Sequence, residues 1–258
     1  RDFCLSRGLG DVYKRQMLGC SDDDDQVTTT STVPFSLTAS LSPRSSDAED
    51  TGILQGNWDA NSQLAVIKTG SSGVPKSILT RKTDSSDTFT GNLSTLVKNE
   101  NEIAVFYPAA AITANSSDTL TQTLNLSGQD GTLAGITNYD YLWAQCKAGM
   151  NETTGSSACE MTSLVTIGKF QFTVNGGSPL NNITRITITA TAGTLYSSAV
   201  MKLKNGEFSS TQTGNITIKN KAGISGTTYI SFFPSEAQLH FTLVTVSYTH
   251  LTLPTILR

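Results

Sequence analysis

The chain has 258 residues and a formal net charge of −3, with 18 Lys and Arg against 21 Asp and Glu. This near balance excludes a protein that follows a nucleic-acid phosphate backbone, because such binding requires a strongly basic surface. No run of eighteen apolar residues occurs, so the sequence predicts no membrane-spanning helix.

Both ends of the chain match translated sequencing adapters. Residues 6–16 back-translate onto a common transposon-based library adapter, and residues 246–255 back-translate onto the complementary strand of its partner. Two matches in opposite orientation are hard to obtain by chance. We therefore expect residues 1–16 and 245–258 to be non-native and the rest to be a fragment, and the fold prediction leaves both ends out.

The first native residues resemble a bacterial lipoprotein processing site. Small and apolar residues at 17–19 precede Cys20, whose thiol would carry lipid and anchor the mature chain. The alternative is a chance Gly-Cys pair beside a solvated acidic tail. The segment 17–33 is acidic and then Thr-rich, with no apolar period, so it predicts a tether without regular structure.

From residue 34 onward, apolar and polar residues alternate. Phe35, Leu37, Ala39 and Leu41 fall on one face, which predicts a half-buried strand. The rest of the chain predicts short strands separated by Gly, Asn and Asp. These strands are expected at 64–67, 77–81, 88–93, 102–107, 118–126, 141–145, 164–174, 185–192, 199–203, 214–219, 227–233 and 238–244.

Many short strands at this spacing predict sandwich-type sheets rather than alternating α/β units. We place an N-terminal domain at 34–146, a junction loop at 147–162 and a second, incomplete domain at 163–244. Cys146 and Cys159 flank the junction loop, and in an oxidising compartment a disulfide between them would pin it. Free thiols are the alternative, whereas a metal site would lack further Cys or His ligands.

Enzyme chemistry is poorly supported, and we predict no enzyme, no cofactor and no metal. His240 is the only histidine outside the terminal segments, and it lies in a predicted strand beside no nucleophile motif. No Gly-rich phosphate loop opens a helix. Trp58 and Trp143 are expected to pack in a core or at a domain interface, with a sugar-binding platform as the alternative.

The order of several motifs resembles the fimbrillins, the major and minor pilins of Gram-negative gut and oral bacteria. The motifs in the N-terminal half are NWD at 57–59, LAVI at 64–67, VFYP at 105–108 and YDYLWA at 139–144. Those in the C-terminal half are KFQFTV at 169–174, ITRITI at 183–188 and YISFFP at 229–234.

This resemblance implies two tandem β-sandwich domains, transthyretin-like or immunoglobulin-like with Greek-key connections, the second truncated. It also implies export as a lipoprotein to the outer membrane and display in a fimbrium at the cell surface. The acidic run after Cys20 looks like the family's surface-export signal. That run is Ser21, Asp22, Asp23, Asp24 and Asp25.

In the family, an Arg-specific protease removes the first strand, and a donor strand from a neighbouring subunit fills the groove by β-strand addition. Arg44 is the only Lys or Arg between Cys20 and Lys68, and it follows the predicted first strand. We therefore expect cleavage after Arg44 to release the lipid tether together with a removable edge strand. An ordinary solvated loop cation is the alternative interpretation of Arg44.

The sequence thus predicts a structural pilus subunit that polymerises with other subunits by strand exchange. The rival hypothesis is a lipid-anchored adhesin, or a pilus anchor or tip protein, that binds glycan or host protein without polymerising.

Overall fold

Strands dominate the chain, which confirms the all-β prediction. The computed structural model describes residues 31–43, 52–70, 73–83, 87–113, 121–174 and 177–245. Sixteen strands lie within these ranges, together with the short helices η1 (Gly52–Gln55), η2 (Ala109–Ala111) and α2 (Leu133–Ile136). None of the helices in these ranges is long and apolar enough to cross a membrane.

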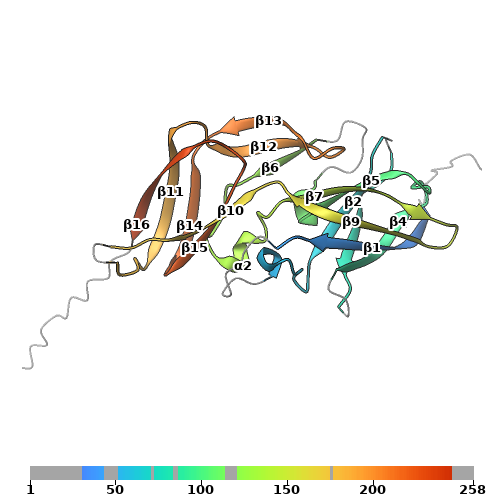
Figure 1. Ribbon diagram of the computed structural model, residues 1–258, viewed down its shortest axis with the longest axis horizontal. Coiled ribbons are helices and arrows are strands. Elements are labelled where there is room, and N and C mark those ends of the chain that lie inside the picture. The colour runs from blue at the N-terminus through green and yellow to red at the C-terminus, as the bar shows by residue number, and fades with distance from the viewer. Residues whose placement is uncertain are drawn as a thin grey trace, which may run out of the picture. The chain divides into compact units, whose positions relative to one another are not determined.

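Seven strands form a sheet that closes on itself. Their order is β1-β4-β3-β2-β5-β7-β9, and the short β8 pairs with the start of β9. β9 pairs back onto β1, and these two strands lie side by side in Figure 1. These eight strands are termed the first region. Their bounds are β1 (Thr32–Leu41), β2 (Gln63–Lys68), β3 (Ser77–Arg81), β4 (Thr88–Ser94), β5 (Glu102–Tyr107), β7 (Leu142–Lys147), β8 (Gly149–Met150) and β9 (Gly155–Ser163).

One face of this closed sheet surrounds a hydrophobic cluster, termed the enclosed cluster. Residues paired across neighbouring strands share that face, as Leu37 and Phe89 do between β1 and β4. The buried members are Phe35, Leu37, Ala39, Trp58, Leu64, Val66, Val74, Leu79, Phe89, Leu93, Val97, Ile103, Val105, Tyr107, Leu142, Ala144, Ala148 and Met161.

The remaining strands, termed the second region, form three smaller sheets. Their orders are β10-β15, β14-β11-β16 and β13-β12-β6. Isoleucines from β11 and β14 and apolar residues from β6, β12 and β15 build a second buried cluster. The bounds are β6 (Thr121–Asn125), β10 (Thr166–Gln171), β11 (Ile183–Ala192), β12 (Tyr196–Lys202), β13 (Phe208–Thr213), β14 (Ile216–Ile224), β15 (Thr227–Phe232) and β16 (Gln238–Thr245).

β2 and β5 are apolar on both faces because each contributes to both clusters. Val66 and Val105 pack in the enclosed cluster, whereas Ala65, Ile67 and Phe106 belong to the second cluster. A strand buried on both faces carries a continuous apolar run instead of an alternation. This explains why both strands are uninterrupted apolar segments in the sequence.

Some sequence-based assignments were wrong. The predicted junction loop 147–162 forms β8 and most of β9, where small and polar residues give no apolar alternation. The prediction also missed β13, which is almost entirely exposed. The predicted tether overlaps the start of β1, and β6, which we placed in the N-terminal domain, pairs with β12 of the second region. The strands predicted at 77–81 and 102–107 are present with those ends, and the remaining predicted strands are present with shifted ends.

Candidate functional site

β1 lies between two strands and not at an edge. It pairs antiparallel with β4 from Thr32 to Thr38, and parallel with β9 from Phe35 to Leu41. The expectation of an edge strand was therefore wrong, because β9, which the sequence predicted as a loop, occupies the second side. The space between β4 and β9 that β1 fills is termed the slot.

Alternate side chains of β1 point into the enclosed cluster, as the alternation predicted. Phe35 is 2% exposed, Leu37 and Ala39 are fully buried, and Leu41 packs half-buried against the same cluster. Phe35 lies opposite Gly155 of β9. A Cβ atom added at Gly155 would lie 2.7 Å from Cδ2 of Phe35, so the glycine leaves the room that the phenyl ring needs.

Trp58 holds the backbone of β1 from the side. Its Nε1 donates a buried hydrogen bond of 2.6 Å to the carbonyl oxygen of Ala39. The rings of Phe89 and Tyr107 pack edge-on against the indole, at centroid distances of 5.0 and 5.3 Å. Because every residue has a backbone carbonyl, this contact suits any strand in the slot. The sequence indicated packing for Trp58, with a sugar-binding platform as the alternative, and gave no sign of a hydrogen bond to Ala39, which lies 19 residues earlier in the chain.

Cys146 of β7 and Cys159 of β9 lie side by side as free thiols. Ser157 Oγ also donates a hydrogen bond of 3.2 Å to Cys146 Sγ. The hydrogen bond with Cys159 lowers the pKa of Cys146, whereas the same contact and burial raise the pKa of Cys159. The structure brings the two residues together without joining them, and the disulfide stays a prediction.

The residues predicted for lipidation, export and cleavage lie outside the described residues. They are Cys20, Ser21, Asp22, Asp23, Asp24, Asp25 and Arg44. Pro43 is the last described residue before Arg44 and follows the end of β1 by two positions. The position of Arg44 directly after the slot strand is thus a property of the sequence.

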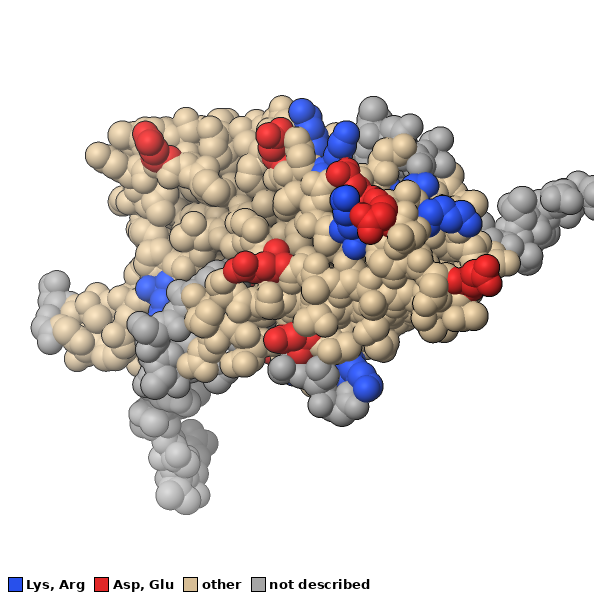
Figure 2. Space-filling view, turned by 45° about the vertical axis from the view of Figure 1, so that its right-hand side comes forward, with Lys and Arg blue, Asp and Glu red and all other residues tan. Residues whose placement is uncertain are grey.

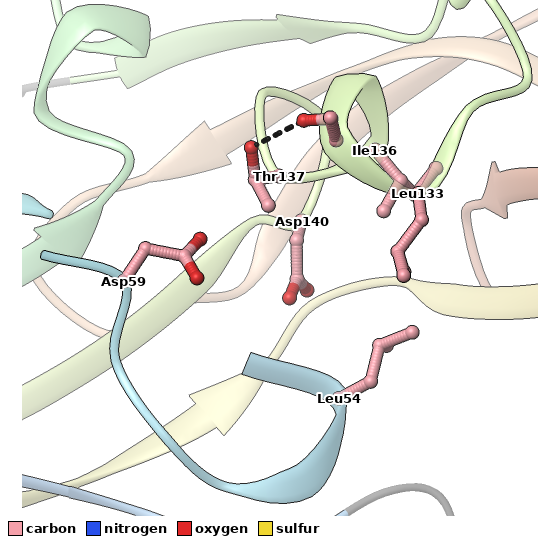
Figure 3. Close-up of a pocket in the computed structure, with 7 residues that line it drawn as sticks. Leu54, Asp59, Leu133, Ile136, Thr137 and Asp140 are labelled. Carbon is pink, nitrogen blue, oxygen red and sulfur yellow. Dashed lines mark hydrogen bonds between the residues drawn. The ribbon is translucent and has the colours of Figure 1, made fainter. Parts of the chain in front are cut away.

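A recess lies beside η1 and α2 (Figure 3). Its volume is about 450 Å³. Asp59 and Asp140 point into this space, and Leu54 and Leu133 line it opposite them (Figure 3). Burial raises the pKa of Tyr107 above its ordinary value, and the two carboxylates raise it further. Asp59 is the more accessible of the two carboxylates, since Asp140 is 1% exposed.

Charged side chains are sparse on the face drawn in Figure 2, and both signs are interspersed there. That face offers no broad basic surface of the kind that a phosphate backbone requires. Within the described ranges, no group of three or more His, Cys, Asp or Glu side chains is placed to hold a metal ion.

The fold resembles that of solved structures with distant sequences. A proposed cell adhesion protein from Bacteroides uniformis superposes with a TM-score of 0.50 at 14% identity, covering 84% of this chain and 80% of that chain. A proposed cell adhesion protein from Bacteroides ovatus gives a TM-score of 0.49 at 14% identity, covering 83% and 86%. A fimbrial assembly protein from Parabacteroides distasonis gives 0.42 at 13% identity, covering 84% and 83%.

No protein-family model and no curated protein matches the sequence. At 14% identity, the likeness to the Bacteroides uniformis protein shows a shared fold and nothing about activity.

Proposed function

We propose that this chain is a structural subunit of a surface fimbria, joined to other subunits by exchange of the strand in the slot. The observation that carries the proposal is the slot itself. A ten-residue strand lies between β4 and β9 with its apolar side chains buried, and a candidate cleavage site follows it in the sequence. A donor strand could therefore replace the contacts of β1, and cleavage after Arg44 would release β1 from the chain.

Removing β1 would leave a cavity that the first region cannot keep open in water. Val33, Phe35 and Leu37 are 9%, 2% and 0% exposed, respectively. Burial of each such side chain contributes ~1.5–3 kcal/mol, hence roughly 5–9 kcal/mol for the three together. This is comparable to the whole stability of a typical domain, about 5–15 kcal/mol. The emptied slot is therefore unstable until another strand enters.

A donor strand from a neighbouring subunit restores these contacts by strand addition. β4 and β9 supply backbone hydrogen bonds on both sides, and Trp58 supplies one more to the donor's backbone. These main-chain contacts give affinity for any extended segment, while pockets for alternate side chains give specificity. The room above Gly155 favours an aromatic residue at the position of Phe35.

Exchange begins, in this proposal, when an Arg-specific protease cleaves after Arg44. Until then β1 remains covalently attached and fills the slot, which prevents premature polymerisation. Lipid on Cys20 holds the precursor at the outer membrane, and the acidic run from Asp22 to Asp25 directs it to the cell surface. The fold shared with a proposed cell adhesion protein from Bacteroides uniformis supports a surface role.

Uptake of a labelled peptide tests the proposal without knowledge of the natural donor. The full chain is trimmed with an Arg-specific protease and mixed with a fluorescent peptide of residues 32–41. We expect the trimmed chain to incorporate this peptide, and to reject one in which neighbouring apolar and polar residues are interchanged. Arg44→Ala should block both trimming and uptake.

The matched control is Arg185→Ala, which removes an exposed arginine of β11 and should leave trimming and uptake unchanged. A trimmed chain that excludes the peptide over the whole incubation would overturn strand exchange. Uptake that persists in Arg44→Ala would overturn the role of Arg44 as the cleavage site.

A non-polymerising surface adhesin is the second candidate function. The recess in Figure 3 favours it, since Asp59 and the leucines Leu54 and Leu133 line a space for a small ligand. An adhesin of this kind remains monomeric and takes up no peptide after protease treatment, so the same experiment distinguishes the two functions.

A further inference from the structure

β9 depends on β1 for most of its pairing. Residues 155–161 of β9 pair with β1. By contrast, β9 pairs with β7 only at residues 162 and 163, and with β8 only at residues 155 and 156. Among the described strands, residues 157–161 therefore have β1 as their one ladder partner. When β1 leaves, this middle part of β9 loses its backbone hydrogen bonds.

Cys146 and Cys159 lie opposite each other where β7 and β9 run side by side without ladder pairing. β9 pairs with β7 at residues 162 and 163 and with β8 at residues 155 and 156, in the same register, and continuing that register places Cys146 opposite Cys159. The two thiols hydrogen bond to each other, and both side chains are only partly buried. On the other side of β9, Cys159 lies beside Ala39 of β1. Opposed residues of antiparallel strands have Cα atoms about 4.5–5.5 Å apart, within the range that disulfides bridge.

We propose that Cys146 and Cys159 are oxidised to a disulfide that fixes β9 to β7, so that the slot keeps both walls when β1 leaves. This inference rests on the proposed strand exchange. A wall that stays in place presents its backbone groups to the incoming strand already aligned. A free β9 would first have to be ordered again, which weakens binding.

The oxidation is a thiol–disulfide exchange with a disulfide-bearing oxidant, such as oxidised glutathione. Cys146 attacks first as the thiolate, because its neighbours favour the deprotonated form. It forms a mixed disulfide, and one oxidant sulfur leaves as a thiolate. Cys159 then loses its proton and attacks Cys146 Sγ, and the second oxidant sulfur leaves. Two protein thiols are oxidised by two electrons, while the oxidant disulfide becomes two thiols.

The bond itself is tested on the untrimmed full chain. Cys4→Ser and Cys20→Ser leave Cys146 and Cys159 as the two remaining cysteines. After incubation of the folded chain with oxidised glutathione, we expect intact mass spectrometry to show the loss of two hydrogen atoms. Non-reducing peptide mapping should then join the two cysteine peptides. Persistent free thiols, or glutathione adducts without the internal bond, would overturn the proposal.

The effect on the slot is tested on the trimmed chain in its oxidised and reduced forms. We expect hydrogen exchange at residues 157–161 to be about tenfold slower when oxidised. The dissociation constant of the labelled peptide should be about tenfold lower in the oxidised form. The Cys146→Ser/Cys159→Ser double variant should behave as the reduced form under both conditions. Equal exchange rates in the two forms would refute the wall-holding role. If no peptide enters in any form, the proposed function fails, while hydrogen exchange still decides the role of the disulfide.

Discussion

The two regions of the molecule differ in how completely their strands are paired and their apolar side chains buried. In the first region, the seven strands of the closed sheet each have a partner on both sides. In the second region, every described sheet ends in strands with a single partner, such as β10 and β16. Phenylalanines from these two strands, Phe170 and Phe241, pack at a centroid distance of 5.0 Å yet stay only half-buried.

The difference shows what the first strand contributes. β1 supplies the enclosed cluster with Phe35, Leu37 and Ala39 and pairs along both of its edges. The first region is therefore complete only while a strand occupies the slot. In the second region the edge strands have one partner each, and their phenylalanines Phe170 and Phe241 are therefore only half-buried.

Truncation of one leucine in each region should give the largest difference in stability loss between the two regions. Leu37→Ala empties a fully buried site in β1, and we expect a loss of about 3–5 kcal/mol. Leu243→Ala removes a half-buried side chain of β16 and should cost about 1 kcal/mol or less. Urea unfolding of both variants measures the difference, and equal losses would contradict the distinction between the regions.

High pH should destabilise the second cluster through Tyr141. Burial between Phe106 and Phe233 raises the pKa of Tyr141 from 10.0 to about 12. Because the unfolded state ionises first, the stability due to neutral Tyr141 is full below pH 10.0 and falls as the pH rises toward 12. The loss amounts to roughly 2–3 kcal/mol at 1.36 kcal/mol per pKa unit.

Denaturant midpoints measured across this pH range test the assignment. Tyr141→Phe should make the alkaline decline shallower and leave the part due to Tyr107, whose pKa burial also raises. An unchanged slope in Tyr141→Phe would show that another group causes the decline.

The two tryptophans offer a matched pair, since each donates to a backbone carbonyl. Trp58 bonds Ala39 in the slot, and Trp143 of β7 bonds Leu203 after β12. Trp58→Phe leaves a buried carbonyl without its donor, so we expect a loss of about 2 kcal/mol and faster hydrogen exchange in β1. Trp143→Phe should leave exchange in β1 unchanged. Slower or unaltered hydrogen exchange in Trp58→Phe would show that the indole does not stabilise β1.

Two glycines beside phenylalanine rings should give the smallest contrast. A Cβ atom at Gly155 would collide with Met150 and Phe35, and one at Gly168 of β10 would collide with Phe170. Phe35 is confined in the enclosed cluster, so Gly155→Ala should cost about 1–2 kcal/mol. Half-buried Phe170 has room to move, and Gly168→Ala should cost less. Thermal unfolding compares them, and the reverse order would place the tighter packing in the second region.

The predictions from sequence succeeded where a side-chain pattern reports burial. The alternation from Phe35 to Leu41 indicated β1 and its buried face, because every second side chain of a strand points the same way. They failed for β9, whose small and polar residues carry no such pattern. The strand forms because its backbone pairs with β1 along most of its length and with β7 and β8 at its two ends, and backbone pairing leaves no trace in residue type.

The candidate site divides in the same manner. Sequence alone determined the all-β class, the apolar face of the first strand and the proximity of Arg44 to its end. Only the tertiary structure decided that β1 has two neighbours, that Trp58 bonds its backbone and that Cys146 and Cys159 meet. The local pattern of apolar and polar residues determines which side chains of a strand are buried. Which distant strands become neighbours depends on how the whole sheet closes, and residue type alone does not specify this.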